Sequence, residues 1–205
     1  MTIPSDSELH QIVERVVRRT MRQSGQAPLG PLPDDAVAPP PDPAPTPVPS
    51  RSDPGSIAIG ADHGGYQLKE ALKRALREQG YNVIDCGTHS ADSVDYPDFA
   101  AAVARLVSEG EAWRGIVIDG AGIGSCMVAN KFPGVRAAMC YDHATALNSR
   151  EHNNANVLTL GAGLLGPNLA QQIVNTWLTT EFSGGRHARR VDKITAFESE
   201  ARKSP

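Results

Sequence analysis

The chain has 205 residues, of which 40% are hydrophobic and 21% charged, and its formal net charge is -3. This length and apolar content predict one ordinary hydrophobic core, and the dispersal of 20 basic residues among 23 acidic ones argues against a polybasic surface for nucleic acid. No apolar run approaches the roughly 18 residues of a membrane span, and the N-terminus lacks the apolar core of a signal peptide, so we expect a cytosolic protein.

The first predicted element is an amphipathic helix within residues 5–24. Ser5 and Glu8 have the spacing of a capping box, and Gly25 can end the helix. Apolar residues recur along one helical face, namely Leu9, Ile12, Val13, Val16, Val17 and Met21. A helix with such a stripe needs a second surface to cover it, so we expect it to bind a partner.

A proline-rich segment follows this helix. Eleven of the 16 prolines of the chain fall between Pro28 and Pro54. Such a run cannot fold into a core and is typical of a semi-rigid spacer. We favour a passive linker over a docking site for a proline-binding domain, because the run is long and repetitive. The predicted organisation is a helix over residues 1–26, a disordered linker over 27–55 and a folded domain over 56–205.

Short apolar runs alternate with helical patterns from Ser56 onward. The runs predicted as strands are residues 57–59, 83–84, 116–118, 137–139 and 157–160. Helices are predicted over residues 68–76, 99–107, 141–151 and 167–180. Five strands that alternate with helices predict an α/β, Rossmann-like three-layer sandwich with a five-stranded parallel sheet. In this architecture ligands bind at the carboxyl ends of the strands.

The third predicted strand ends on Asp119 and opens into a turn that contains Gly120, Gly122 and Gly124. Glycines let backbone N–H groups crowd around an anion, and the helix that follows adds a partial positive charge. A phosphate or an enediolate oxyanion is therefore the expected ligand. The same spacing also occurs where glycines only pack a helix against a strand, so the turn alone does not decide the function.

Two other segments carry polar residues that we also expect at strand ends. Asp62 and His63 follow the first strand and offer a hydroxyl-binding carboxylate and an imidazole that can move a proton. Residues 149–156, with His152 and Asn153, precede the last strand. Each of these residues also has a purely structural explanation, as a turn residue, a helix N-cap or a helix-end residue.

The three cysteines Cys86, Cys126 and Cys140 form no pair with the spacing of metal ligands. An odd number without a secretion signal indicates free thiols. The sequence therefore predicts no metal site.

Five motifs stand in a fixed order along the folded domain. They are Gly60-Ala-Asp62-His63-Gly-Gly65, Asp95-Tyr96-Pro97, the glycine turn with Ala129-Asn130-Lys131, Ser149-Arg-Glu-His152-Asn153, and Gly184-Gly-Arg186-His187-x-x-Arg190. This order resembles the ribose-5-phosphate isomerase B family, which includes the galactose-6-phosphate isomerase subunits, over residues 56–198. The resemblance implies interconversion of an aldose phosphate and a ketose phosphate through an enediolate, without metal or organic cofactor. Ribose 5-phosphate and ribulose 5-phosphate are the expected pair.

The resemblance also assigns roles to the matching residues in a homodimer or larger homo-oligomer with shared active sites. The side chains that it places on sugar hydroxyls and on the phosphate are those of Asp62, Tyr96, His63, Arg186 and Arg190. The amides that it places on the enediolate oxygen are those of Gly120, Gly122 and Gly124. The residues that it brings from the partner chain are His152, which would open the sugar ring, together with Asn153, Arg186 and Arg190.

The chain departs from the family pattern in two respects. Many members carry the catalytic base, a cysteine, where this chain has Asp119, and another branch carries a glutamate at the position of Ser125. We expect Asp119 to replace the thiolate, and Cys126 is the second candidate for the base. Gly163 stands where relatives commonly carry a phosphate-binding arginine, so the reaction class is better defined than the substrate.

The N-terminal helix on its proline-rich spacer resembles the encapsulation peptides that direct enzymes into bacterial microcompartments. Shell proteins are then the expected partners of residues 5–24. The alternatives are a coiled-coil helix, a basic helix on a membrane surface and a helix that folds back on its own domain.

Other functions remain open at this stage. The enzyme could act on a six-carbon or deoxy sugar phosphate, or the chain could be a non-catalytic sugar-phosphate-binding or scaffolding protein. A dinucleotide-dependent redox enzyme is disfavoured, because the first strand leads into Asp62 and His63 rather than into a glycine fingerprint.

Overall fold

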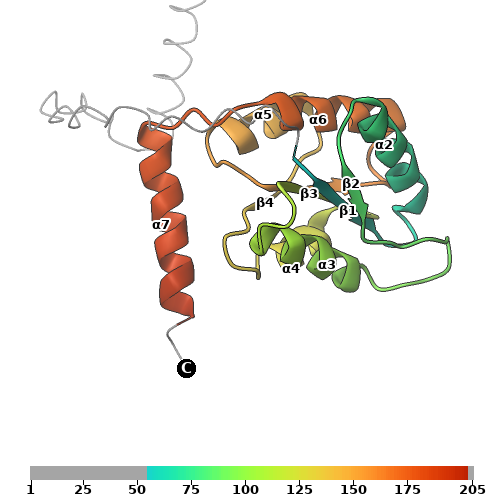
Figure 1. Cartoon of the computed structure of the whole chain (residues 1–205), viewed down its shortest axis with the longest axis horizontal. Helices are drawn as coiled ribbons and strands as arrows, with labels where there is room; N and C mark the ends of the chain where they lie inside the picture. Colours follow the sequence, from blue (N-terminus) through green and yellow to red (C-terminus); the bar gives the residue numbers. More distant parts are fainter. Residues whose placement is uncertain (1–54, 203–205) are drawn as a thin grey trace, which may run out of the picture. The chain divides into compact units, whose positions relative to one another are not determined.

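The computed structural model describes residues 55–202 (Figure 1). The predicted helix of residues 1–26 and nearly all of the predicted linker lie outside these residues. The described elements are β1 (Ile57–Ala61), α2 (Tyr66–Glu78), β2 (Val83–Asp85), α3 (Tyr96–Ser108), β3 (Arg114–Asp119), α4 (Ile123–Ala129), β4 (Ala137–Met139), α5 (His143–Glu151), β5 (Val157–Gly161), α6 (Pro167–Thr179) and α7 (Arg186–Ala201).

The five strands form one sheet in the order β2-β1-β3-β5-β4, and all neighbouring pairs are parallel. The predicted Rossmann-like fold with a five-stranded parallel sheet is therefore confirmed. In the register of the central pairs, Ala61 lies beside Ile118, and Asp119 lies beside Gly161. The ends of β1, β3 and β5 thus meet at one edge of the sheet.

The two faces of the sheet carry side chains of different size. Helices α2, α5 and α6 cover one face and α3 and α4 the other, as Figure 1 shows. Large strand residues such as Ile57, Ile59 and Leu158 face the first layer. Toward α3 the sheet presents small residues, so that a Cβ atom on Gly60 or Gly115 would collide with Val103. Helix α3 therefore packs closely on the strands that carry the predicted site.

Helix α7 was not predicted from the sequence. Gly184 and Gly185, with φ values of 62° and 52°, turn the chain into it. Its inner side buries His187 and Val191, whereas the outer part of the helix leaves Ile194 and Phe197 exposed. The buried stripe of α7 is short, and this is why its apolar pattern is weak. Near the end of the helix, the Glu198 carboxylate accepts a hydrogen bond from the amide of Gly134 at 3.0 Å.

The close packing of α3 gives a stability prediction. In a Gly115→Ala variant the new Cβ atom would lie 2.6 Å from Cγ1 of Val103. We expect this overpacking to lower the free energy of unfolding in urea by about 1–3 kcal/mol. Gly166→Ala is the matched control, because no atom lies within 4 Å of its Cβ position, and its effect should stay within about 0.5 kcal/mol. Equal stability of the two variants would contradict the packing described here.

Candidate active site

Asp119 ends β3 as a buried carboxylate and is bound on both oxygens by the turn that follows it. Oδ1 accepts hydrogen bonds from the amide of Ala121, at 2.8 Å, and from that of Gly122. Oδ2 accepts from the amide of Ser125 at 3.0 Å and from its hydroxyl at 2.5 Å. The side chain is 4% exposed, so these four donors replace water around the charge. The carboxylate thereby fixes the shape of the glycine turn.

Two of the glycines in the turn are required by geometry. Gly122 has a φ of 80°, in the left-handed region, and lies against the backbone of Leu160. At Gly124 a Cβ atom would lie 2.5 Å from the ring of Tyr96. The tyrosine, the first residue of α3, thus lies directly over the turn. The amide of Gly122 donates to the Asp119 carboxylate, so this residue also shapes the turn.

Asp62 and His63 lie beside this turn, on the neighbouring strand end. The amide of Asp62 donates to the carbonyl of Ile118 at 3.2 Å, one residue before Asp119. The Asp62 carboxylate accepts from the amide of Gly65 at 2.9 Å. His63 is exposed, and its Nδ1 lies 3.2 Å from the carbonyl oxygen of Val94. A carboxylate and an imidazole are therefore held next to the glycine turn.

Gly163 lies on the opposite side of the turn. Its amide donates to the carbonyl of Gly120 at 3.0 Å, and a Cβ atom at this position would lie 2.9 Å from the same oxygen. An arginine at residue 163 would therefore require the turn to shift. The glycine at position 163 and the backbone position of Gly120 therefore depend on each other.

His152 and Asn153 lie at the other edge of the sheet, so the expectation that residues 149–156 join the carboxyl ends of the strands is wrong. His152 is the C-cap of α5, and a helix that follows one parallel strand returns the chain to the amino end of the next. The carbonyl of Asn156 accepts from the amide of Gly115 at 2.9 Å, at the start of β3. Four strand residues, or about 13 Å, separate this level from Asp119.

The start of α7 lies with His152 rather than with Asp119. The rings of His152 and His187 are stacked, with centroids 4.1 Å apart and planes 3° from parallel. Nδ1 of His152 also lies 2.8 Å from Nδ2 of Asn148. Arg186 and Arg190 are exposed on the same helix. Within one chain, the predicted residues thus form two separate groups.

The predicted residues of each group share one edge of the sheet. The turn group consists of Asp62, His63, Tyr96, Asp119, Gly120, Gly122 and Gly124. The helix group consists of His152, Asn153, Arg186 and Arg190.

The three thiols differ in their surroundings. Burial raises the pKa of Cys86 and of Cys140 to about 11, so both are protonated near neutral pH. Cys126 is partly buried, and its sulfur lies 3.5 Å from the carbonyl of Ala137 and 3.6 Å from Nδ2 of Asn130. These contacts direct the sulfur toward β4 and away from the glycine turn.

Two residues that contact these groups were not among the predicted site residues. Ser125 was expected only to stand where some relatives carry a glutamate, although its hydroxyl and amide both bind Asp119. A signal was present, because Asp119 precedes a serine at the start of a helix, where hydroxyls and carboxylates commonly bind free amides. His187 stands in a motif that the sequence analysis quotes, but no local pattern predicts its stacking on His152.

Within residues 55–202, no group of three or more histidine, cysteine or acidic side chains is placed to hold a metal ion. In the same part of the chain, no helix has the length and apolar character that crossing a membrane requires.

Comparisons with known proteins agree with this geometry. Residues 57–194 match the family model for ribose/galactose isomerase. Ribose-5-phosphate isomerase B of Escherichia coli is 46% identical over 142 residues, which are 69% of this chain and 95% of that protein. D-erythrulose-4-phosphate isomerase of Pectobacterium atrosepticum is 43% identical over 144 residues, or 70% of this chain and 95% of that protein.

Solved structures give the same result. Ribose-5-phosphate isomerase B of Clostridium thermocellum superposes with a TM-score of 0.70 at 54% identity, over 71% of this chain and 99% of that chain. The enzyme of Mycoplasma genitalium with bound ribulose-5-phosphate has a TM-score of 0.69 at 41% identity, over 71% of this chain and 97% of that chain.

Proposed function

The chain belongs to the ribose/galactose isomerase family and is a sugar-phosphate aldose–ketose isomerase, and we propose that its substrate pair is ribose 5-phosphate and ribulose 5-phosphate. The observation that carries the proposal is the glycine turn, which Asp119 holds open beside Asp62, His63 and Tyr96. This arrangement suits an oxyanion that is flanked by sugar hydroxyls and a phosphate.

A panel of aldose phosphates tests the substrate. Purified protein without added metal should act on ribose 5-phosphate with a higher kcat/KM than on four-carbon or six-carbon aldose phosphates. A preference for a four-carbon substrate would instead indicate the activity for which the relative from Pectobacterium atrosepticum is named. Turnover of no sugar phosphate, together with retained binding, would favour the non-catalytic alternative.

The turn group supplies the proposed steps of proton transfer. Asp62 and Tyr96 hold hydroxyl groups of the open-chain sugar. The base removes the proton from C2, and the amides of Gly120 and Gly124 stabilise the enediolate oxygen. The proton of the C2 hydroxyl passes to O1, and the proton held by the base is delivered to C1, so that C2 becomes the carbonyl carbon of the ketose. His63 binds the phosphate. No redox partner enters, since the proton and the electron pair stay within the substrate.

We assign the base to Asp119. A carboxylate offers about four acceptor positions, and here three backbone amides and the Ser125 hydroxyl engage them. The hydroxyl is the one donor that can rotate away, and its rotation frees Oδ2 for the substrate proton. Cys126 is the weaker candidate, because its sulfur contacts Ala137 and Asn130.

Substitutions separate these assignments. Asp119→Asn should lower kcat at least about a hundredfold with a modest change in KM, the usual effect of losing a positioned base. Ser125→Ala keeps the carboxylate and removes one hydrogen bond, so turnover should stay within about tenfold. Cys126→Ala should be active. Near-normal turnover of Asp119→Asn beside an inactive Cys126→Ala would show that the assignment is wrong.

A second copy of the chain is the proposed source of the helix group. Within one chain His152 lies near the amino ends of the strands and Asp119 at their carboxyl ends. A homodimer can bring the helix group of one chain to the turn group of the other. His152 would then open the sugar ring, Asn153 would bind beside it, and Arg186 and Arg190 would bind the phosphate. The exposed Ile194 and Phe197 on α7 support an apolar contact between subunits.

Subunit mixing tests a shared site. Asp119→Asn and His152→Ala should each inactivate the homodimer. After the two are unfolded and refolded together, half of the dimers carry one of each chain, and one of their two sites is intact, so about a quarter of wild-type activity should return. Each variant refolded alone serves as the control. Failure to regain activity, with mixed dimers present, would place both residues of a site in one chain.

Residues 5–24 are proposed to direct the enzyme to a microcompartment shell from the cytosol. The support is the apolar stripe in the sequence and the proline-rich segment that separates it from the catalytic domain. A few buried side chains, each worth about 1.5–3 kcal/mol, suffice for a micromolar helix-in-groove contact.

Deletion of residues 1–55 should leave isomerase activity unchanged and abolish co-localisation with co-expressed shell proteins. Val13→Glu with Val17→Glu should have the same effect, whereas Glu14→Gln with Arg18→Gln, on the polar side of the pattern, should not. Loss of activity or of the dimer on truncation would instead assign the segment to the catalytic assembly.

A further inference from the structure

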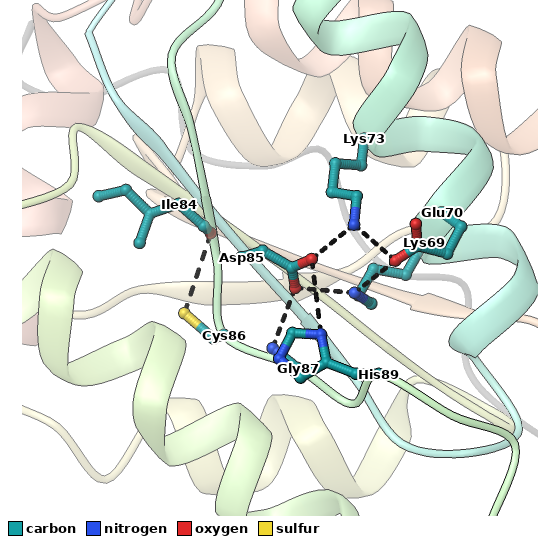
Figure 2. Close-up of polar contacts among 8 residues, drawn as sticks. All are labelled: Lys69, Glu70, Lys73, Ile84, Asp85, Cys86, Gly87 and His89. Atoms are coloured by element: carbon teal, nitrogen blue, oxygen red, sulfur yellow. Dashed lines mark hydrogen bonds and ion pairs between the residues drawn. The ribbon is translucent and has the colours of Figure 1, made fainter.

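A buried cluster of charged side chains lies at the end of β2, outside both site groups (Figure 2). Lys69 on α2 is fully buried, and its Nζ donates to Oδ1 of Asp85 at 2.7 Å and to Glu70 at 2.8 Å. Lys73, one turn further along α2, donates to Oδ2 of Asp85 and to Glu70, both at 2.6 Å. Both carboxylate oxygens of Asp85, the last residue of β2, thus accept hydrogen bonds from lysine side chains.

The cluster keeps Asp85 ionised. Burial works to raise the pKa of Asp85, but the ammonium groups of Lys69 and Lys73 and the amide of Gly87 outweigh it and hold that pKa well below its usual range. A buried ion pair of this kind is weak evidence for stability, since apolar side chains of similar shape often stabilise a core as well. The retained charges therefore call for another explanation.

That explanation lies in what Asp85 binds besides the lysines. Its Oδ1 also accepts the amide of Gly87 at 3.0 Å. The carbonyl of Gly87 accepts the amide of Ala61 at 2.7 Å, and the amide of Thr88 donates back to the carbonyl of Ala61 at 2.6 Å. Ala61 is the residue directly before Asp62. A continuous series of hydrogen bonds thus runs from the lysines to the backbone of the turn group.

The far end of the same loop, residues 86–95, also reaches the site. Val94 contacts the ring of His63 through its backbone, and Tyr96 follows the loop and lies over Gly124. Asp85 fixes the first residues of the loop, and the site residues contact its last ones. A shift of the loop would move a hydroxyl-binding and a phosphate-binding side chain together.

We infer that Asp85, held by Lys69 and Lys73, is a positioning residue that sets the loop of residues 86–95 against Asp62, His63 and Tyr96. It touches no substrate and acts through Gly87. The inference rests on the proposed function of these three residues as substrate contacts. Its structural part, the order of the loop, is measurable without any activity.

The test removes the contacts of Asp85 with Lys69 and with the loop without leaving an unpaired buried charge. In the double variant Lys69→Met with Asp85→Leu, both members of the buried pair become apolar and the acceptor for the Gly87 amide is lost, while Lys73 keeps Glu70 as its partner, so the chain should keep a cooperative unfolding transition. Hydrogen–deuterium exchange of the amides of residues 87–94 should rise at least about tenfold. The KM for ribose 5-phosphate and the inhibition constant of inorganic phosphate should rise, and kcat should fall.

A matched control lies in the same cluster. Glu70 binds both lysines but makes no contact with the loop, and its side chain is 35% exposed. Glu70→Gln should leave exchange of residues 87–94 and both constants within about twofold, as expected for a partly exposed ion pair. A general loss of stability would affect exchange throughout the sheet, whereas the inferred role affects residues 87–94 first.

The outcomes separate the inference from the proposed function. A folded double variant with unchanged loop exchange and unchanged constants would overturn the inference. A wild-type protein that turns over no sugar phosphate would overturn the proposed function, while loop exchange would still decide the role of Asp85. If the double variant does not fold, Asp85→Glu replaces it. This variant keeps the charge but moves the carboxylate by one methylene, and an unaltered loop there would equally refute the role.

Discussion

The hydrogen bonds that Asp119 accepts from the turn after β3 are the constraint on which the site depends. A carboxylate that is 4% exposed must find donors in the protein, and the turn supplies them through the amides of residues 121, 122 and 125. That turn needs the left-handed conformation of Gly122. Two neighbouring residues pack against this turn. The ring of Tyr96 lies against Gly124, and the amide of Gly163 donates to the carbonyl of Gly120.

Sheet topology keeps the two groups of predicted site residues apart within one chain. In a parallel sheet every helix carries the chain from the carboxyl edge back to the amino edge, so a residue at the end of α5 stands a full strand away from Asp119. The stacked rings of His152 and His187 tie the start of α7 to the same edge. The phosphate-binding arginines are therefore remote from the glycine turn of their own chain. A shared site follows from the topology together with the proposed chemistry.

The elements that were predictable from the sequence are those with local causes. The strands are short and mainly apolar, and the structure confirms all five and their parallel pairing. Helix α7 was missed because its buried stripe on this chain is short. Residues 149–156 were expected at the carboxyl ends of the strands, and this was wrong. They precede β5 and therefore lie near the amino ends of the strands, whereas only residues that follow a strand lie at its carboxyl end. The pairing of Lys69 with Asp85, 16 residues away, was also missed, because hydrophobic periodicity contains no information about such pairing.

The ends of three strands share one local hydrogen-bonding pattern. Asp62, Asp85 and Asp119 follow or end β1, β2 and β3, and each accepts an amide from two or three residues further along. This is the local geometry by which aspartate favours turns. The charges of these carboxylates are spread over amides, a hydroxyl and two lysines before any substrate binds. A phosphate dianion still needs cations, and the carboxyl edge of this chain offers only His63 for that purpose among the residues assigned here. In the proposed dimer, Arg186 and Arg190 of a second copy would supply that charge, so the charge balance of the site and the separation of the two groups both support the proposed shared site.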